Sequence, residues 1–586
     1  MILQALCDYY KRKSDLPRLG FETKAIPFVI EISAAGKLVQ IEDTRHIEGK
    51  KKIARNFLVP QGEKKTSGVA TNLLWDNAEY VLRASGADKL AEMSTERRMK
   101  YRLRLREMRN AFIAQIMALP EGTHEDTGLT AVLNFLASDF KHMKANRKRL
   151  NADPLWSEIL ETNPVLTFRL NADLELVCQR PAVRAVLEKA ETDAEEITCS
   201  ISGEIDVFER LHTSIKGVWG AQSSGANIVS FNKDAFNSFN KEQGANAPVG
   251  KHVVFAYTTA LNYLLSKEST QRIQVGDTST VFWSEKPTGL EESFADLFSE
   301  PPKDDPAKQT RAIEALFKAP QMGVLNDEGK KTRFYVLGLA PNAARISVRF
   351  WQIGTVAEMS ARIRQNFEDL EIIHASFEKP YLSLFRLLVS TATQGKSENI
   401  PPNLAGEFMR AILAGIPYPQ TLLQATVRRI RAEREVTYPR AALIKACLNR
   451  QVRYSPSQEK EITVSLDESN MNPGYRIGRL FATLEKIQEE SSPSLNATIR
   501  DRFYGAASSS PVTVFANLMK LKNHHLAKLD EGRKRYFEKL IGQIMSDIND
   551  FPSHLNLADQ GRFAIGYYHQ RQAFFTKSES TTNKGE

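Results

Sequence analysis

Short runs of alternating hydrophobic and polar residues mark the first 355 positions and predict strands. Residues 26–33 and 38–42 are two such runs on either side of an Ala-Ala-Gly-Lys turn, and this arrangement predicts a β-hairpin. The same kind of pattern predicts further strands at residues 165–170, 174–178, 197–202 and 279–284.

A second hairpin is predicted at residues 333–351, with a Pro-Asn turn. Because side chains alternate along a strand, Ile346, Val348 and Phe350 are expected on one face. The opposite face would carry Arg345, Ser347, Arg349 and Trp351. Two arginines and a tryptophan suit the clamping or stacking of nucleic acid, and they suit a half-buried sheet face equally well.

From about residue 361 the hydrophobic spacing becomes helical and stays so almost to the end. In the last segment it predicts helices at residues 475–489, 495–504, 512–529 and 533–549. The whole pattern predicts an α+β protein with a mixed α/β region at 1–355, a helical middle region at 356–470 and a helical bundle at 471–586.

Two segments depart from these patterns. Residues 215–250 are rich in Gly, Ser, Asn and Gln, and Trp and Phe recur among them, which predicts an ordered, loop-rich surface pinned by its aromatic side chains. Residues 285–310 are acidic and contain several prolines, which predicts a linker or an insertion.

Charge adds a preference for polyanions to this picture. The chain of 586 residues carries a formal net charge of +9. Most of the excess lies in residues 1–110, which hold 22 Lys and Arg against 14 Asp and Glu. A concentrated basic surface attracts nucleic acid, because phosphate contacts release counterions.

The basic residues of this part fall into groups. Two helical runs, at 96–109 and 141–149, suit either a solvated helix face or phosphate contact. Three consecutive lysines occur elsewhere, and a Lys-Lys pair precedes Thr66, Ser67 and Gly68. Small polar residues beside lysine let a backbone approach DNA and donate N–H groups to phosphate.

Motifs for catalysis are missing from the sequence. It contains no G-x-x-x-x-G-K-[ST] phosphate loop, no G-x-S-x-G elbow and no H-E-x-x-H zinc motif. The four cysteines, at 7, 178, 199 and 447, are too scattered for a zinc ribbon or a disulfide framework and are expected to be buried thiols. We therefore expect a non-catalytic protein without cofactor or metal. No apolar run is long enough for a membrane span, and the N-terminus lacks the order of a secretory signal, so we expect the protein in the cytoplasm.

Several long phrases together resemble one family, the large subunit of the type I-C (Dvulg-subtype) CRISPR Cascade complex. They include LVP…EKK…NLLWDNAEYVL, IKGVWGAQSSGANIVSFN, LGLAPNAARISVRFW and MNPGYRIGRLFATLEKIQ, at residues 58–82, 215–232, 337–351 and 471–488. The resemblance extends over nearly the whole chain.

The resemblance implies a set of partners. They are the CRISPR RNA, the Cascade backbone and RNA-processing subunits, target double-stranded DNA and a separate helicase–nuclease. It also implies that the chain recognises the protospacer-adjacent motif and helps to open the R-loop, while guide pairing reads the remaining sequence. The alternative from a different class is a metal-dependent nuclease, which would need a carboxylate or histidine cluster that the sequence does not reveal.

Family position and composition together suggest the residues that contact nucleic acid. The motif contacts are expected from two loops, at Lys64, Lys65, Ser67, Gly68 and Asn72, and at Gln222, Ser223, Ser224, Gly225, Asn227 and Asn232. Phosphate contacts are expected at Lys50, Lys51 and Lys52. In similar systems a small subunit is translated from an internal start, and Met471 is placed where such a start would lie; the alternative is an ordinary methionine in a linker. Copies of 471–586 would then bind displaced single strand through Arg476, Arg479, Arg500, Arg502, Lys520 and Lys522.

Overall fold

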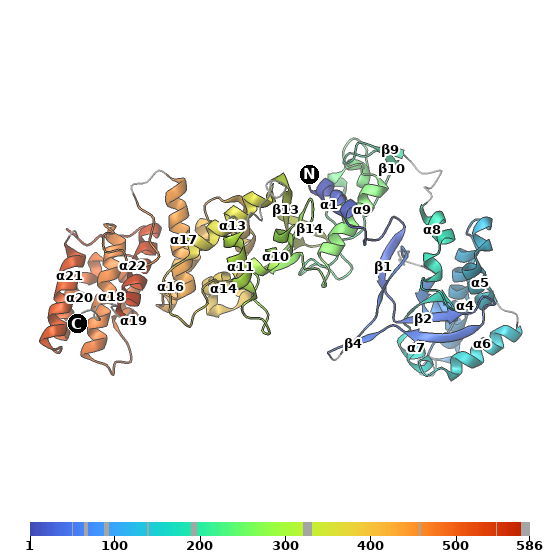
Figure 1. Ribbon diagram of the computed structural model, residues 1–586, viewed down its shortest axis with the longest axis horizontal. Coiled ribbons are helices and arrows are strands. Elements are labelled where there is room, and N and C mark those ends of the chain that lie inside the picture. Colours follow the sequence, from blue (N-terminus) through green and yellow to red (C-terminus); the bar gives the residue numbers. More distant parts are fainter. Residues whose placement is uncertain are drawn as a thin grey trace, which may run out of the picture. The chain divides into compact units, whose positions relative to one another are not determined.

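The computed structural model (Figure 1) divides by its internal contacts into two compact units. Unit 1 comprises residues 1–12, 211–246 and 260–586, and unit 2 comprises residues 13–210 and 247–259. The structure describes residues 1–49, 51–63, 68–86, 93–137, 140–188, 196–319, 331–455, 459–546 and 548–575. The predicted α+β class is confirmed, and among these residues every strand lies before position 356. The predicted boundaries after 355 and 470 stay a prediction.

Unit 2 contains a four-stranded sheet in the order β3-β2-β8-β7. Its central strand β2 is buried along its whole length, as expected for an apolar run flanked by two strands. The predicted first hairpin is confirmed as β2–β3. Its turn needs a glycine, because Gly36 has a φ of +76° and a Cβ there would lie 2.7 Å from the Asn134 Cβ. The strands are β2 (Phe28–Ile32), β3 (Leu38–Asp43), β7 (Trp75–Asn77) and β8 (Val165–Leu170).

Helices and two-stranded ribbons complete unit 2. The helices are α2 (Ala78–Leu82), α4 (Thr95–Met117), α5 (Thr127–Ala137), α6 (Phe140–Ala152), α7 (Trp156–Thr162), α8 (Pro181–Glu188) and part of α9 (Lys251–Leu264). The ribbons are β1 (Phe21–Ala25) with β6 (Asn56–Pro60), β4 (His46–Glu48) with β5 (Lys51–Ile53), and β9 (Glu196–Thr198) with β10 (Ile205–Val207).

The strand predicted at 174–178 is wrong. Residues Val177–Gln179 form a 3-10 turn instead. The side chain of Gln179 accepts a hydrogen bond from the Leu176 N–H and donates one to the Leu58 carbonyl, so it takes the place of a ladder partner. Apolar alternation alone does not reveal such side-chain bonds to the backbone.

Unit 1 contains an antiparallel sheet in the order β11-β12-β13-β14, with α1 (Ile2–Arg12) beside it. The predicted hairpin at 333–351 is confirmed as β13–β14. The strands are β11 (Arg272–Val275), β12 (Thr278–Ser284), β13 (Arg333–Asn342) and β14 (Arg345–Thr355).

A bulge in β14 overturns the predicted division of its faces. Phe350 pairs with Gly338 and Val348 pairs with Leu339, so the register shifts at Arg349. Because paired residues share a face, Val348 lies on the face of Trp351 and not on that of Phe350.

The segment predicted as an acidic linker folds into α10 (Gly289–Phe298), so that prediction is wrong for its central part. The Thr288 side chain caps the helix by accepting from the Glu291 N–H at 3.3 Å. Phe294, Leu297 and Phe298 are buried, and the carboxylate of Glu291 is ion-paired with Arg12 at 2.6 Å. The acidic composition had concealed an amphipathic helix, which is followed by α11 (Lys308–Lys318).

The part of unit 1 that follows β14 is largely helical, as predicted. One hydrophobic cluster extends from Ile273 to Tyr568, so the last helices share a continuous core with the middle region. The predicted bundle lacked its final helix, α22, which packs in parallel against α18. The helices are α13 (Val356–Leu370), α14 (Leu384–Thr391), α15 (Leu404–Ala414), α16 (Gln420–Glu433), α17 (Tyr438–Tyr454), α18 (Pro473–Ser491), α19 (Ile499–Ala507), α20 (Val512–Leu526), α21 (Glu531–Met545) and α22 (Leu557–Phe575).

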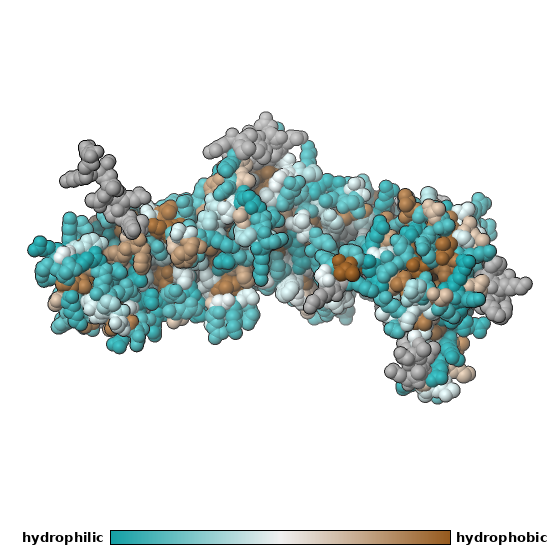
Figure 2. Space-filling view, turned by 60° about the horizontal axis from the view of Figure 1, so that its bottom comes forward, coloured by the Kyte–Doolittle hydropathy of each residue, from teal (hydrophilic) through white to brown (hydrophobic). Residues whose placement is uncertain are grey.

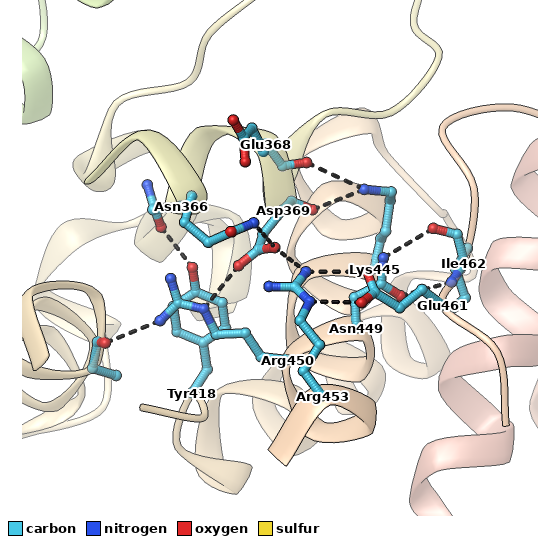
Figure 3. A network of polar contacts seen from close by, with 12 residues as sticks. Asn366, Glu368, Asp369, Tyr418, Lys445, Asn449, Arg450, Arg453, Glu461 and Ile462 are labelled. Carbon is cyan, nitrogen blue, oxygen red and sulfur yellow. Dashed lines mark hydrogen bonds and ion pairs between the residues drawn. The ribbon is translucent and has the colours of Figure 1, made fainter. Parts of the chain in front are cut away.

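A buried polar network ties α13 to α17 (Figure 3). The Asp369 carboxylate accepts from Arg450 Nε at 2.8 Å and from Arg453, and both Asp369 and Arg450 are fully buried. The Arg450 guanidinium also lies 4.1 Å from the centre of the Tyr418 ring. Lys445 donates to the main-chain carbonyl of Asp369 at 3.1 Å. Arg450 and Lys445 therefore belong to the interior and are not available to a partner, whereas Arg453 reaches the surface.

The expectation of buried thiols is confirmed. Cys7, Cys178, Cys199 and Cys447 are all free and buried. Burial raises the pKa of the Cys178 and Cys447 thiols to about 12, which keeps both protonated at neutral pH.

Candidate nucleic-acid interface

The first predicted motif loop lies between β6 and β7 of unit 2. Lys64, Lys65 and Ser67 lie outside the described residues. Gly68 has a φ of +79°, and a Cβ at this position would have no neighbour within 4 Å, so Gly68 faces open space.

Asn72 lies inside this loop and not on its surface. It is buried, and its Oδ1 accepts from the Glu63 N–H at 2.9 Å. Its own N–H donates to Asp76 Oδ2 at 3.0 Å. Asn72 therefore joins the two ends of the loop, and its side chain is buried within the loop's stem.

The loop is also anchored through Trp75 and Val69. Trp75 Nε1 donates to the Pro60 carbonyl at 2.8 Å, and a Cβ at Gly62 would lie 3.1 Å from the Trp75 ring. On the other side of the loop, Val69 packs against Tyr80 and against Leu105 and Met108 of α4. The stem of the loop is thus fixed to the basic helix α4.

Two lysines of the triplet, Lys51 and Lys52, lie on strand β5 of the β4–β5 ribbon. Lys50 lies outside the described residues, and the side chain of Lys51 is not described. Lys52 pairs across the ribbon with Ile47, whose side chain is 78% exposed. The Arg45 guanidinium, with a smaller contribution from Lys52, lowers the pKa of Asp43 and of Glu158. Lys52 therefore lies near carboxylates as well as solvent.

The second predicted motif loop lies in the segment 215–250, which is ordered as expected, and its residues up to 246 belong to unit 1. Asn227 bridges to β14, since its carbonyl accepts from the Ile346 N–H at 3.0 Å. Its side chain donates to the His212 carbonyl at 2.9 Å and accepts from Ser214 at 3.2 Å. Asn227 is therefore a structural residue that fastens the loop to the sheet.

The exposed part of the same loop is a polar turn at Gln222, Ser223 and Ser224. The turn is closed by a bond from the Gly225 N–H to the Gln222 carbonyl at 2.9 Å. Gly225 has a φ of +98°, and a Cβ there would lie 2.9 Å from the Ser214 Cβ, so this position requires glycine. The three preceding side chains project from a rigid base.

Two aromatic side chains of this loop are exposed, which corrects the expectation that they pin it. Trp219 is 63% exposed and Phe239 is 94% exposed. The Trp219 backbone is nevertheless fixed, because its N–H donates to Ser279 Oγ at 3.0 Å. The sequence signal was an aromatic residue beside small or polar neighbours, since Trp219 precedes Gly220 and Phe239 lies between Ser238 and Asn240.

Arg345 lies at the tip of the β13–β14 hairpin beside this loop. Its guanidinium lies 4.2 Å from the centre of the Phe236 ring and donates to Asn232 Oδ1. Trp351, by contrast, stacks on Tyr335 with ring centres 5.6 Å apart. Arg349 is ion-paired with Asp277 at 3.2 Å. Among the residues predicted to share one face of this strand, Trp351 is therefore packed within the sheet.

The six predicted strand contacts of the last helices divide into buried and exposed residues. Arg476 donates to the Asn470 carbonyl at 3.0 Å and Arg479 donates to Gln570 at 3.1 Å, and both are buried within the bundle. They were expected to contact DNA, and their burial leaves them no free face for it. Arg500 lies 3.7 Å from the buried carboxylate of Glu485.

The remaining cations of the bundle lie at its surface. Arg502 and Lys520 are exposed and Lys522 is partly exposed. The corner between α20 and α21 adds three exposed cations that the sequence prediction missed, with an exposed Tyr536 beside them: Lys528, Arg535 and Lys539. The sequence feature that could have revealed these cations is the alternation of basic and apolar residues across 520–539.

Metal-binding clusters and membrane-spanning helices are absent from the described part of the chain. No group of three or more His, Cys, Asp or Glu residues there is arranged to hold a metal ion. In the same part, no helix combines the length and the apolar character needed to cross a bilayer. Figure 2 shows one face of the molecule, on which hydrophilic residues predominate and hydrophobic ones form small separate groups.

Comparison with known proteins gives one match. The family model described as CRISPR-associated protein (Cas_Csd1) matches residues 6–575. None of the curated proteins matches the chain.

Proposed function

The chain belongs to the CRISPR-associated Cas_Csd1 family, and from this premise we propose that it is the non-catalytic large subunit of a type I-C Cascade complex. In this role it recognises the protospacer-adjacent motif in duplex DNA and promotes the R-loop that the guide RNA forms. It works in the cytoplasm with the backbone and RNA-processing subunits and delivers the target to a helicase–nuclease.

The observation that carries the proposal is the rigid polar turn at Gln222–Ser224. Its base is fixed to the sheet through Asn227 and Trp219, and its three side chains are exposed. Amide and hydroxyl groups on a fixed backbone read base edges by hydrogen bonds, and their preorganisation limits the entropy lost on binding. A reader of a short motif needs few such groups, since guide pairing reads the rest.

The loop of residues 61–72 supports the same role from unit 2. Asn72 holds its stem, so the contacts with DNA fall to the residues between Glu63 and Val69, with Lys52 as a phosphate contact. In the bundle, displaced single strand is bound by Arg502, Lys520 and Lys522 together with Lys528, Arg535 and Lys539. Cations beside an exposed tyrosine suit a strand whose bases are unpaired.

The test is DNA binding by a complex reconstituted with guide RNA and backbone subunits, with and without this chain, on targets with and without the motif. We expect tight duplex binding only when both chain and motif are present. The substitutions Gln222→Ala and Ser223→Ala should reduce the preference for the motif, while Ser238→Ala in the same loop should not. Binding that is indifferent to the chain would overturn the proposal, and Mg²⁺-dependent cleavage by the purified chain would overturn its non-catalytic part.

A separate small subunit that starts at Met471 is part of the proposal. Met471 lies two residues before α18 and is 58% exposed. In the full chain, Gly561 of α22 packs against Ile444, Leu448 and Leu423, so the released segment would expose this apolar face to a neighbouring subunit. Replacing the Met471 codon by a non-start codon should remove a species of the size of residues 471–586. If the unmodified gene produces no such species, this part fails.

A further inference from the structure

The arginine-rich helix α4 has no role in the proposed contacts, and we propose that it forms a phosphate-binding surface for duplex DNA together with Arg83 and Arg147. This inference rests on the proposed function, because it places the phosphates on the same duplex that the loop of residues 61–72 contacts. The ligand is recognised through its backbone charge and not through its sequence.

The charges of α4 are strongly unbalanced. The helix contains seven Lys and Arg and two Asp and Glu. One exposed ion pair forms along it, between Lys100 and Glu96 at 2.8 Å. Within the described part of the chain, no carboxylate pairs with the exposed Arg102, Arg104 or Arg106.

Several other arginines of unit 2 are, by contrast, ion-paired. Arg180 is bound by Asp126 and Asp173, Arg45 by Asp43 and Glu158, and Arg184 by Glu175. The available carboxylates thus neutralise cations elsewhere and leave the α4 face positive. Binding of a polyanion to such a surface is favourable, because it relieves the mutual repulsion of the cations and releases counterions from the nucleic acid.

Arg109 concentrates further charge at the C-terminal half of this face. Its guanidinium donates to the carbonyls of Val81 at 2.6 Å and Leu136 at 2.8 Å, so it is held by neutral groups. Burial, with the nearby charges of Arg83 and Arg147, lowers the pKa of Arg109 to about 10, and the group is still protonated at neutral pH. Arg83 at the end of α2, Arg109 of α4 and Arg147 of α6 therefore lie close together.

The rigid attachment of α4 decides which nucleic acid it meets. Leu105, Met108, Phe112 and Ile116 bury one face of the helix, and Arg102 and Arg106 are exposed one turn apart. Through Leu105 and Met108 the helix also packs against Val69 of the loop of residues 61–72. Phosphates within reach of α4 are therefore neighbours of any duplex held by that loop.

The experiment uses the full complex and the double variant R102Q/R106Q, with R184Q as the matched control. Arg184 is an exposed arginine of the same unit, but it is ion-paired with Glu175. The dissociation constant for target duplex is measured over a series of salt concentrations. Each phosphate contact contributes about −0.9 to the slope of the logarithm of the association constant, the reciprocal of the dissociation constant, against the logarithm of the salt concentration. The double variant, which loses two contacts, should therefore flatten this slope by about two units. The control should leave it unchanged, and the ratio of affinities with and without the motif should stay the same in both.

Parallel arms identify the source of the phosphates. Guide RNA content of the purified complex and binding of single-stranded DNA are measured with the same variants. An unchanged salt slope on duplex DNA overturns the inference, and so does a defect confined to guide RNA or to single strand. If the unmodified complex shows no preference for the motif, the proposed function fails. A flattened slope in the double variant would still support the phosphate surface.

Discussion

Helices α4 and α18 both carry arginines that were considered for nucleic-acid contact, yet the fold uses them differently. Helix α18 is surrounded by α19, α20, α21 and α22, and it buries Arg476 and Arg479. Helix α4 packs mainly on α2 and α5 and exposes Arg102 and Arg106. The difference shows that the number of neighbouring helices, and not the arginine content, decides whether a cation is available to a partner.

The strongest way to break this comparison is to separate α18 from α22. A Cβ at Gly478 would lie 2.1 Å from the Phe563 carbonyl oxygen, so Gly478→Ala must move one backbone. We expect a loss of about 3 kcal/mol in the free energy of unfolding. The measurement is urea unfolding of the purified chain followed by circular dichroism.

Gly542→Ala in α21 is the matched control for that substitution. A Cβ at Gly542 has no neighbour within 4 Å, and alanine is the better helix former, so we expect a gain of about 0.5–1 kcal/mol. If Gly478→Ala were as well tolerated as Gly542→Ala, the close packing of α18 on α22 would be wrong.

Protonation tests the same interface. His569 of α22 lies 2.9 Å from the Tyr475 hydroxyl of α18, and burial lowers its pKa to about 4. An unfolded histidine takes up its proton near pH 6.5, so between these two values the unfolded state binds more protons. Stability contributed by neutral His569 is therefore complete above about pH 6.5 and is lost as the pH falls towards 4.

We expect this loss to be about 1–3 kcal/mol over that window, measured by urea unfolding at a series of pH values. His569→Gln should flatten the pH dependence, whereas Gly542→Ala should shift the whole curve without changing its shape. Burial also lowers the pKa of His212 to about 4, so part of the slope should persist in the variant. A curve that His569→Gln leaves unchanged would contradict the assignment.

Removing a buried arginine should have a smaller effect when its volume is kept. Burial lowers the pKa of Arg479, which shows that its charge is costly at this position. Arg479→Met replaces the cation by an apolar chain, and we expect a change within about 1 kcal/mol in unfolding free energy. Binding of single-stranded DNA should stay the same, while Lys520→Gln should weaken it. A selective loss of DNA binding in Arg479→Met would mean that Arg479 reaches the strand.

Periodicity predicted much of this fold. The hairpins β2–β3 and β13–β14 and most of the C-terminal helices follow from hydrophobic spacing, because each element contacts a single core. It missed features that depend on particular contacts, such as the bulge at Arg349, the buried α10 and the cap formed by Gln179. These depend on hydrogen bonds and on neighbours that lie far apart in the sequence.

The candidate site was predictable to the level of segments but not of side chains. Composition marked residues 215–250 as a polar surface, yet Asn227 fastens this loop and Trp219 projects from it. In the same way Asn72 was expected to read a base, and the structure uses it to close a loop. An asparagine in a polar segment suits both roles, and its partners decide between them.

Substitutions of the exposed arginines of α4 should have the smallest effect on stability. Arg102 and Arg106 are exposed and have no carboxylate partner within the described part of the chain, so R102Q/R106Q removes repulsion but no packing. We expect the free energy of unfolding to change by no more than about 0.5 kcal/mol, measured by the same urea unfolding. A structural role would instead appear as a loss comparable to that of Gly478→Ala. If stability stays constant while the salt dependence of duplex binding falls, the α4 arginines act on a partner, because the fold itself does not need them.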